Sequence, residues 1–132
     1  MTLMRDHIHT RFLAAASAAG MLAAASCGSS STSSPSPNTT TIRIANNAVS
    51  PKDVVVTRGS QVMFINNDSI PHDIASNPHP EHTDCPEINA VGVLSPGQSR
   101  LTGNMTTNRA VCGFHDHDLP TVVSLQGTIT IQ

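Results

Sequence analysis

The sequence predicts an all-β domain built as a two-sheet antiparallel sandwich, and three observations support this fold class. Short apolar runs recur along residues 42–132, and clusters of Gly, Pro, Asn, Asp and Ser separate them. Several of these runs alternate apolar and polar residues with a period of two, as half-buried strands do. The same region shows no helical periodicity. Strands at such short intervals are typical of β-sandwiches.

The first half of this region predicts three strands. The first begins at Thr41, because Ile42 and Ile44 point to one side and polar residues point to the other. A β-branched run at 53–57 ends in a turn that contains glycine. Residues 61–66 are apolar on both faces, which indicates a central strand with both faces buried.

The second half predicts strands on either side of a long irregular segment. Three prolines interrupt residues 76–90, so this segment is expected to lack regular structure. The strands expected here are residues 71–75, 91–94, 100–105, 109–112 and 127–132. We expect 100–105 and 109–112 to pair as a hairpin, and Ile129 and Ile131 to point into the core.

The N-terminus has the pattern of an export signal. Arg5 and Arg11 precede an almost uninterrupted apolar stretch at 12–25, which matches the charged and apolar regions of a signal peptide. This stretch is short and rich in alanine compared with a membrane span. Residues 1–26 are therefore expected to be a signal peptide.

The residues around Cys27 indicate membrane anchoring. Residues 24–27 (Ala-Ala-Ser-Cys) resemble the bacterial lipobox, which implies a lipid on Cys27, and a plain signal peptidase site in the same stretch is the alternative. Residues 27–41 are rich in Ser, Thr and Pro and form a flexible tether. We expect the domain at 42–132 to be lipid-anchored in the cell envelope, facing the periplasm or the exterior.

Size and charge exclude several function classes. The net charge of −2 argues against a nucleic-acid binder that uses a basic patch. The chain of 132 residues leaves room for one small domain, and no Ser-His-Asp spacing indicates catalysis, so no enzyme is expected. Metal binding is a chemistry that such a small domain can support.

The histidines are the residues that point to a metal. Beyond the signal peptide they fall into two segments, 71–82 and 112–117, and they are His72, His79, His82, His115 and His117. All are expected in loops or at strand ends, which gather at one end of a sandwich. Imidazole suits copper, zinc, iron and nickel, and a neighbouring thiolate narrows the choice toward copper or zinc.

Four segments within residues 41–132 form a pattern: the strand at 62–68 with the Pro-His that follows it, the turn at 93–98, the Cys-Gly-Phe-His at 112–115 and the closing Gly-Thr-Ile-Thr-Ile. Together they resemble the cupredoxins, the small Greek-key copper domains that include plastocyanin and azurin. The resemblance implies a cupredoxin-like Greek-key β-sandwich that binds copper. It also implies that His72, Cys112 and His115 form a trigonal copper plane.

The sequence departs from the cupredoxin pattern at the axial ligand. No Met occurs after Met105, and Leu125 stands where shorter loops carry the axial Met. His117 is the candidate replacement ligand. The segment with His79 and His82 has no counterpart in plastocyanin, and it could be an additional metal site, a lid or a polar loop.

The cysteines leave two arrangements open. With Cys27 lipidated, Cys85 and Cys112 remain, and two thiols in an oxidising compartment usually form a disulfide. Cys112 is then either a copper ligand or the partner of Cys85. In the second arrangement His72, His115 and His117 are left as a histidine-only site.

Two functions follow from these alternatives. The first is one-electron transfer through copper to a redox partner protein. The second is copper binding without redox turnover, for scavenging, storage or delivery, together with a copper-handling partner. A metal-free sandwich used for adhesion is the third interpretation.

Overall fold

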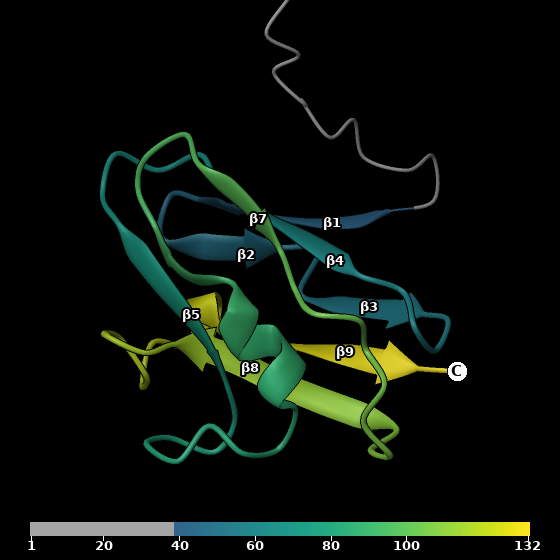
Figure 1. Cartoon of the computed structure of the whole chain (residues 1–132). Coiled ribbons are helices and arrows are strands. Elements are labelled where there is room, and N and C mark those ends of the chain that lie inside the picture. The colour runs from purple at the N-terminus through teal and green to yellow at the C-terminus, as the bar shows by residue number, and fades with distance from the viewer. Residues whose placement is uncertain (1–38) are drawn as a thin grey trace, which may run out of the picture. The chain divides into compact units, whose positions relative to one another are not determined.

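The computed structural model describes residues 39–132, which form two β-sheets packed against each other (Figure 1). The four-stranded sheet has the order β2 (Ala48–Ser50), β1 (Thr40–Ala45), β4 (Val62–Asn66) and β7 (Ser99–Leu101). The five-stranded sheet has the order β3 (Asp53–Val56), β9 (Gly127–Ile131), β8 (Val111–Asp116), β5 (His72–Ser76) and β6 (Gly92–Leu94). The expected signal peptide, Cys27 and most of the expected tether lie outside the described residues.

The all-β sandwich predicted from the sequence is confirmed, but its strands are not all antiparallel. The pairs β1–β4 and β3–β9 are parallel, and the remaining strand pairs are antiparallel. After β2 the chain crosses to the other sheet as β3 and then returns as β4 beside β1. This crossing brings β4 back in the direction of β1, which no local alternation pattern can reveal.

The hairpin expected from 100–105 and 109–112 is wrong. The strand β7 pairs with β4, whereas β8 pairs with β5 and β9 in the other sheet. Between them the chain passes from one sheet to the other, and fully buried Met105 packs in the core on the way. Residues 102–110 therefore connect the two sheets and do not form a hairpin turn within one sheet.

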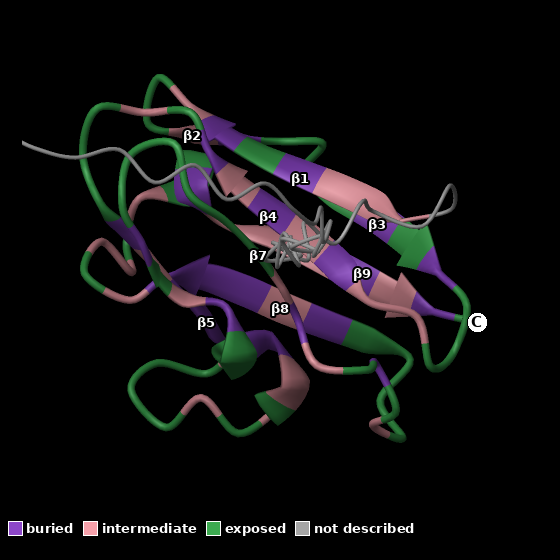
Figure 2. Cartoon of the chain, turned by 45° about the horizontal axis from the view of Figure 1, so that its top comes forward, coloured by how far each residue is buried: buried purple, intermediate pink, exposed green. Residues whose placement is uncertain are grey.

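The core lies between the sheets and consists mainly of aliphatic side chains. Buried and more exposed residues alternate along β1, which Figure 2 shows as alternating colours. Phe64 of β4 and Phe114 of β8 meet edge to face across the core, with ring centroids 5.1 Å apart. This contact joins one strand of each sheet.

Two short 3-10 helices complete the described part of the chain: η1 (Pro86–Ala90) follows β5, and η2 (Val123–Leu125) precedes β9. No helix within residues 39–132 is long and apolar enough to cross a membrane. Ile88 of η1 and Leu125 of η2 are buried, so each helix closes part of the core.

The strand β8 is longer than predicted, and its two faces carry different chemistry. The ladder to β5 continues to Asp116, so His115 lies inside a strand and not in a loop. Because side chains alternate along a strand, Phe114 and Asp116 share the core face, whereas His115 points to the opposite, outer face. This alternation determines which histidines can meet.

Candidate metal centre

The irregular segment between β5 and η1, residues 77–85, is fixed to β8, and we call it the His loop. The backbone N–H of Asn77 donates to the carbonyl of Gly113, at 3.0 Å. At the other end, Cys85 is bonded to Cys112. The carboxylate of Asp84 also pairs with Arg109 at 2.6 Å. Both ends of the His loop are therefore held against the same strand.

The His loop and β8 bring four imidazoles together. Each offers one ring nitrogen, and all of these nitrogens lie within 4.8 Å of one another. This four-histidine cluster consists of His79, His82, His115 and His117. The His117 Nδ1 and the His82 Nε2 are only 3.2 Å apart. His79 is exposed and His115 is buried, so the cluster extends from the sheet to the surface.

His115 presents one free ring nitrogen. Its Nδ1 lies 2.7 Å from the side-chain Oδ1 of Asn77, which can only accept a hydrogen bond. Its Nε2 is buried and has no hydrogen-bond partner among the described residues. Buried polar atoms normally have a hydrogen-bond partner. A histidine that binds a metal through one nitrogen usually hydrogen-bonds through the other, and His115, with its free Nε2 beside three other imidazoles, has this arrangement.

Electrostatics favour the neutral forms of two of these imidazoles. Burial lowers the pKa of His115, and the neighbouring His82, His79 and His117 lower it further. Burial is also the main cause that lowers the pKa of His82, followed by His117 and His79. A metal binds the neutral imidazole, so both shifts favour the ligand form near neutral pH.

The four-histidine cluster fits a transition metal. With metal–nitrogen bonds of about 2.0–2.1 Å, the ligands of a tetrahedral site are about 3.3 Å apart. The hydrogen-bonded pair of His117 and His82 has this spacing at 3.2 Å, and the four nitrogens, within 4.8 Å of one another, would move closer together around an ion. Imidazole donors suit copper, zinc and nickel. The orphaned Nε2 of His115 is a further sign of fit.

The structure places His72 outside the four-histidine cluster. Its Nδ1 lies 2.7 Å from Asp116 Oδ2, and its Nε2 lies 3.1 Å from Asp68 Oδ2. His72 and Asp116 face the core, on the side of the sheet opposite His115. The structure therefore does not bring His72 and His115 to one metal, because the sheet itself separates their side chains.

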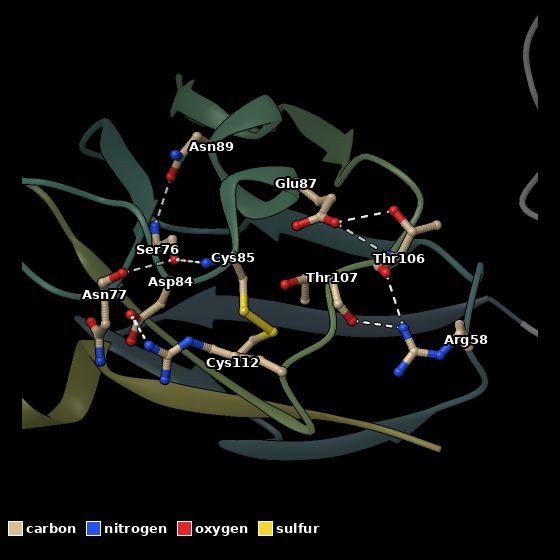
Figure 3. Close-up of a disulfide and its surroundings, with 11 residues drawn as sticks. Arg58, Ser76, Asn77, Asp84, Cys85, Glu87, Asn89, Thr106, Thr107 and Cys112 are labelled. Carbon is tan, nitrogen blue, oxygen red and sulfur yellow. Dashed lines mark hydrogen bonds and ion pairs between the residues drawn. A yellow bond between two sulfur atoms is a disulfide. The ribbon is translucent and has the colours of Figure 1, made fainter.

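Cys112 also lies outside the cluster, because its sulfur is not free. Cys85 and Cys112 form a disulfide with a Cα–Cα distance of 5.7 Å, and both residues are fully buried (Figure 3). Of the two arrangements left open by the sequence, the structure has the disulfide. The trigonal set of His72, Cys112 and His115 is thus not assembled.

His117 and the His-loop histidines have a different relation from the one expected. From the sequence, His117 is the candidate axial ligand or a ligand of a histidine-only site. The segment with His79 and His82 is an additional metal site, a lid or a polar loop. The structure brings all three together with His115 in one cluster. Leu125, at the position expected for the axial ligand, is buried in the core.

Sequence reasoning missed Asn77 and the reason for Gly113. A Cβ atom built on Gly113 would lie 2.2 Å from the Asn77 Nδ2 atom, so only glycine permits this contact. A glycine inside a strand often marks such a close approach, and this was the available signal. Nothing local identifies Asn77, because its side chain contacts His115 and Gly113, which lie far along the chain.

Comparison with known proteins identifies the fold. No protein-family model and no curated protein sequence matches the chain. Among solved structures, a reduced single-site mutant of amicyanin is similar with a TM-score of 0.56 and 15% identity, covering 74% of this chain and 85% of that one. A mutant fern plastocyanin has a TM-score of 0.53 and 20% identity, covering 70% of this chain and 99% of its own. An oxidised plastocyanin from Dryopteris crassirhizoma, at 19% identity, has a TM-score of 0.52 over 70% of this chain and 99% of its own.

These similarities establish that residues 39–132 have the cupredoxin fold. The sequence identities are low, so the similarity concerns the arrangement of strands and not the ligands. The side chains of this chain itself therefore determine where a metal could bind.

Proposed function

We propose that the protein is an exported copper-binding protein that holds the ion in the four-histidine cluster and does not use it for redox turnover. This proposal rests on one observation, that four imidazole nitrogens lie within 4.8 Å of one another. The ion would be scavenged, stored or delivered, and the partner would be a copper-handling protein. No catalytic role is proposed.

Copper is the proposed metal because both the fold and the donor set point to it. The solved structures with this fold include amicyanin in its Cu(I) form. Four imidazole donors suit Cu(II), which binds nitrogen ligands more tightly than the other divalent first-row metals do. Zinc is the competitor that the same donors would accept.

The disulfide at Cys112 favours a copper-binding function over electron transfer. The electron-transfer function implied by the cupredoxin resemblance depends on a thiolate in the copper plane. In this chain the sulfur of Cys112 is bonded to Cys85, and His72 is engaged by two carboxylates. A histidine-only site on the outer face of the sheet supports a binding role better.

Titration with Cu(II) tests this proposal directly. We expect the disulfide-intact protein to bind one equivalent of Cu(II) tightly. His82→Ala and His117→Ala should each weaken binding by more than about 100-fold, because the loss of a ligand should exceed the roughly 10–100-fold effect of losing a residue that only positions one. His72→Gln is the matched control and leaves the copper affinity unchanged. The proposal fails if His72→Gln abolishes binding while His82→Ala does not.

We further propose that the protein is anchored through a lipid on Cys27 and faces the periplasm or the exterior. This rests on residues 24–27 and on the polar stretch that follows them. Membrane fractionation of Cys27→Ala provides the check. The variant should accumulate in the soluble fraction or remain unprocessed, and unchanged membrane association would contradict the anchor.

A further inference from the structure

We propose that Asn77 is a positioning residue of the four-histidine cluster: its side-chain oxygen fixes the proton of His115 on Nδ1 and leaves Nε2 as the ligand atom. The metal-binding consequence rests on the proposed function. The proton position itself does not, because it can be measured in the metal-free protein.

The hydrogen bond carries the first step of the argument. The Asn77 Oδ1 lies 2.7 Å from the His115 Nδ1, and an amide oxygen only accepts. The Nδ1 must therefore donate, and a neutral imidazole has only one proton to give. The lone pair is then on Nε2, which is buried and unpartnered among the described residues.

The position of the carboxamide depends on Gly113. The Asn77 Nδ2 occupies the space in which any other residue at position 113 would have its Cβ, 2.2 Å away, and the Asn77 Cγ is 3.0 Å from the same point. The reversed carboxamide would donate to Nδ1 and place the imidazole proton on Nε2, which would block the ligand atom. The missing side chain at Gly113 thus makes room for the amide that orients His115.

Asn77 also joins the two segments that supply the ligands. Its backbone N–H donates to the carbonyl of Gly113 in β8, and its carbonyl accepts from the N–H of Asp84 at the far end of the His loop, at 2.8 Å. The Ser76 hydroxyl donates to the same carbonyl at 3.0 Å. Asn77 is therefore held in place independently of its side chain, as a positioning residue needs to be.

Nitrogen-15 NMR of the metal-free protein, combined with Cu(II) titration, tests this role. We expect the His115 ring in the native protein to carry its proton on Nδ1. In Asn77→Ala this preference should be lost, and the Cu(II) affinity should fall by about 10–100-fold, as is typical for outer-shell residues. Asn77→Asp retains an acceptor, so it should keep the Nδ1 proton and most of the affinity.

The control is Asn67→Ala, at an exposed asparagine that follows β4, which should change neither measurement. A native protein with the His115 proton on Nε2 would overturn the proposal, and this outcome needs no variant to fold. An unchanged proton position and affinity in Asn77→Ala would overturn it as well. A third outcome separates the two proposals. If the His115 proton leaves Nδ1 in Asn77→Ala but the native protein binds no Cu(II), the role of Asn77 is supported and the proposed function is contradicted.

Discussion

Two buried histidines in this sandwich differ in which ring nitrogens are occupied, and this difference separates their roles. Both nitrogens of His72 face carboxylates, those of Asp116 and Asp68. His115 has one nitrogen on an amide oxygen and the other unpartnered within the described residues. An imidazole whose two nitrogens are both engaged by carboxylates has no nitrogen left for a metal, whereas one with a free nitrogen can bind a ligand. Residue type and burial alone do not distinguish them.

The lowered pKa of His115 has a consequence for stability. The unfolded chain takes up a proton near the ordinary histidine pKa of about 6.5, and the folded His115 resists this uptake because it is buried beside other imidazoles. The free energy of unfolding of the metal-free protein should therefore be fully retained above about pH 6.5 and fall as the pH decreases below it. Urea unfolding between about pH 7.5 and pH 5.5 measures this change.

His115→Gln should reduce that pH dependence, because it removes a group whose proton uptake is suppressed in the folded state. His82, whose pKa burial also lowers, accounts for the part that remains. The Asp68 carboxylate beside His72 does not interfere in this window. The pKa of Asp68 is itself lowered, chiefly by the backbone N–H of Asn47, so its protonation takes place at more acidic pH. A flat profile in the native protein would contradict the burial of an uncharged His115.

At the scale of elements, the His loop depends on its attachment to β8. Figure 3 shows the disulfide at the end of the loop, with Asp84 beside it. Asp84 forms an ion pair with Arg109. The ion pair is largely exposed at Arg109 and adds little. The disulfide should therefore carry most of the restraint on the two loop histidines.

Replacing both Cys85 and Cys112 by serine should destabilise the fold and weaken Cu(II) binding together. Removal of a native disulfide from a small domain typically costs about 2–5 kcal/mol, and here it also frees the loop that holds His79 and His82. Urea denaturation and Cu(II) titration measure the two effects. Asp84→Asn serves as the control with a small effect on both. Unchanged Cu(II) affinity in the double serine variant would show that the disulfide does not hold the loop histidines.

Most strands could be predicted from the sequence, because alternation reports directly on burial. The strands β1, β3, β4, β5 and β9 lie close to their predicted ranges. The short strand β2 and the assignment of strands to sheets could not be predicted, because they depend on pairing between distant segments.

The candidate site was only partly predictable, and the reason lies in the extent of β8. Cys112 and His115 are three residues apart, so within one strand they point to opposite faces and cannot share a metal. His115 and His117 are two apart and can share a face. The sequence predicts that this strand ends at Cys112, which places His115 in a loop and leaves open which face each of the two side chains occupies.

At the scale of the molecule, the sandwich has a hydrophobic core that does not involve the metal site, so a bound metal would only add to the stability of an already folded domain. Both sheets contribute fully buried aliphatic and aromatic side chains, and the four-histidine cluster lies on the outer face of one sheet. Chelation should therefore leave the β-sheet circular dichroism intact. It should lower the free energy of unfolding by the binding linkage, about 2.7 kcal/mol at a free copper concentration 100 times the dissociation constant. Loss of the β-sheet signal on chelation would instead indicate a domain organised by its metal.

The visible spectrum of the Cu(II) protein tests the central claim, that histidines and not a cysteine hold the metal. The disulfide-intact protein should bind Cu(II) with a pale spectrum, without an intense thiolate-to-copper absorption, and thiol titration should find no reactive sulfur at Cys85 or Cys112. Electron paramagnetic resonance should show hyperfine coupling to imidazole nitrogens that changes in His117→Ala. An intense visible absorption that disappears in Cys112→Ser, with a free thiol in the metal-free protein, would contradict the account.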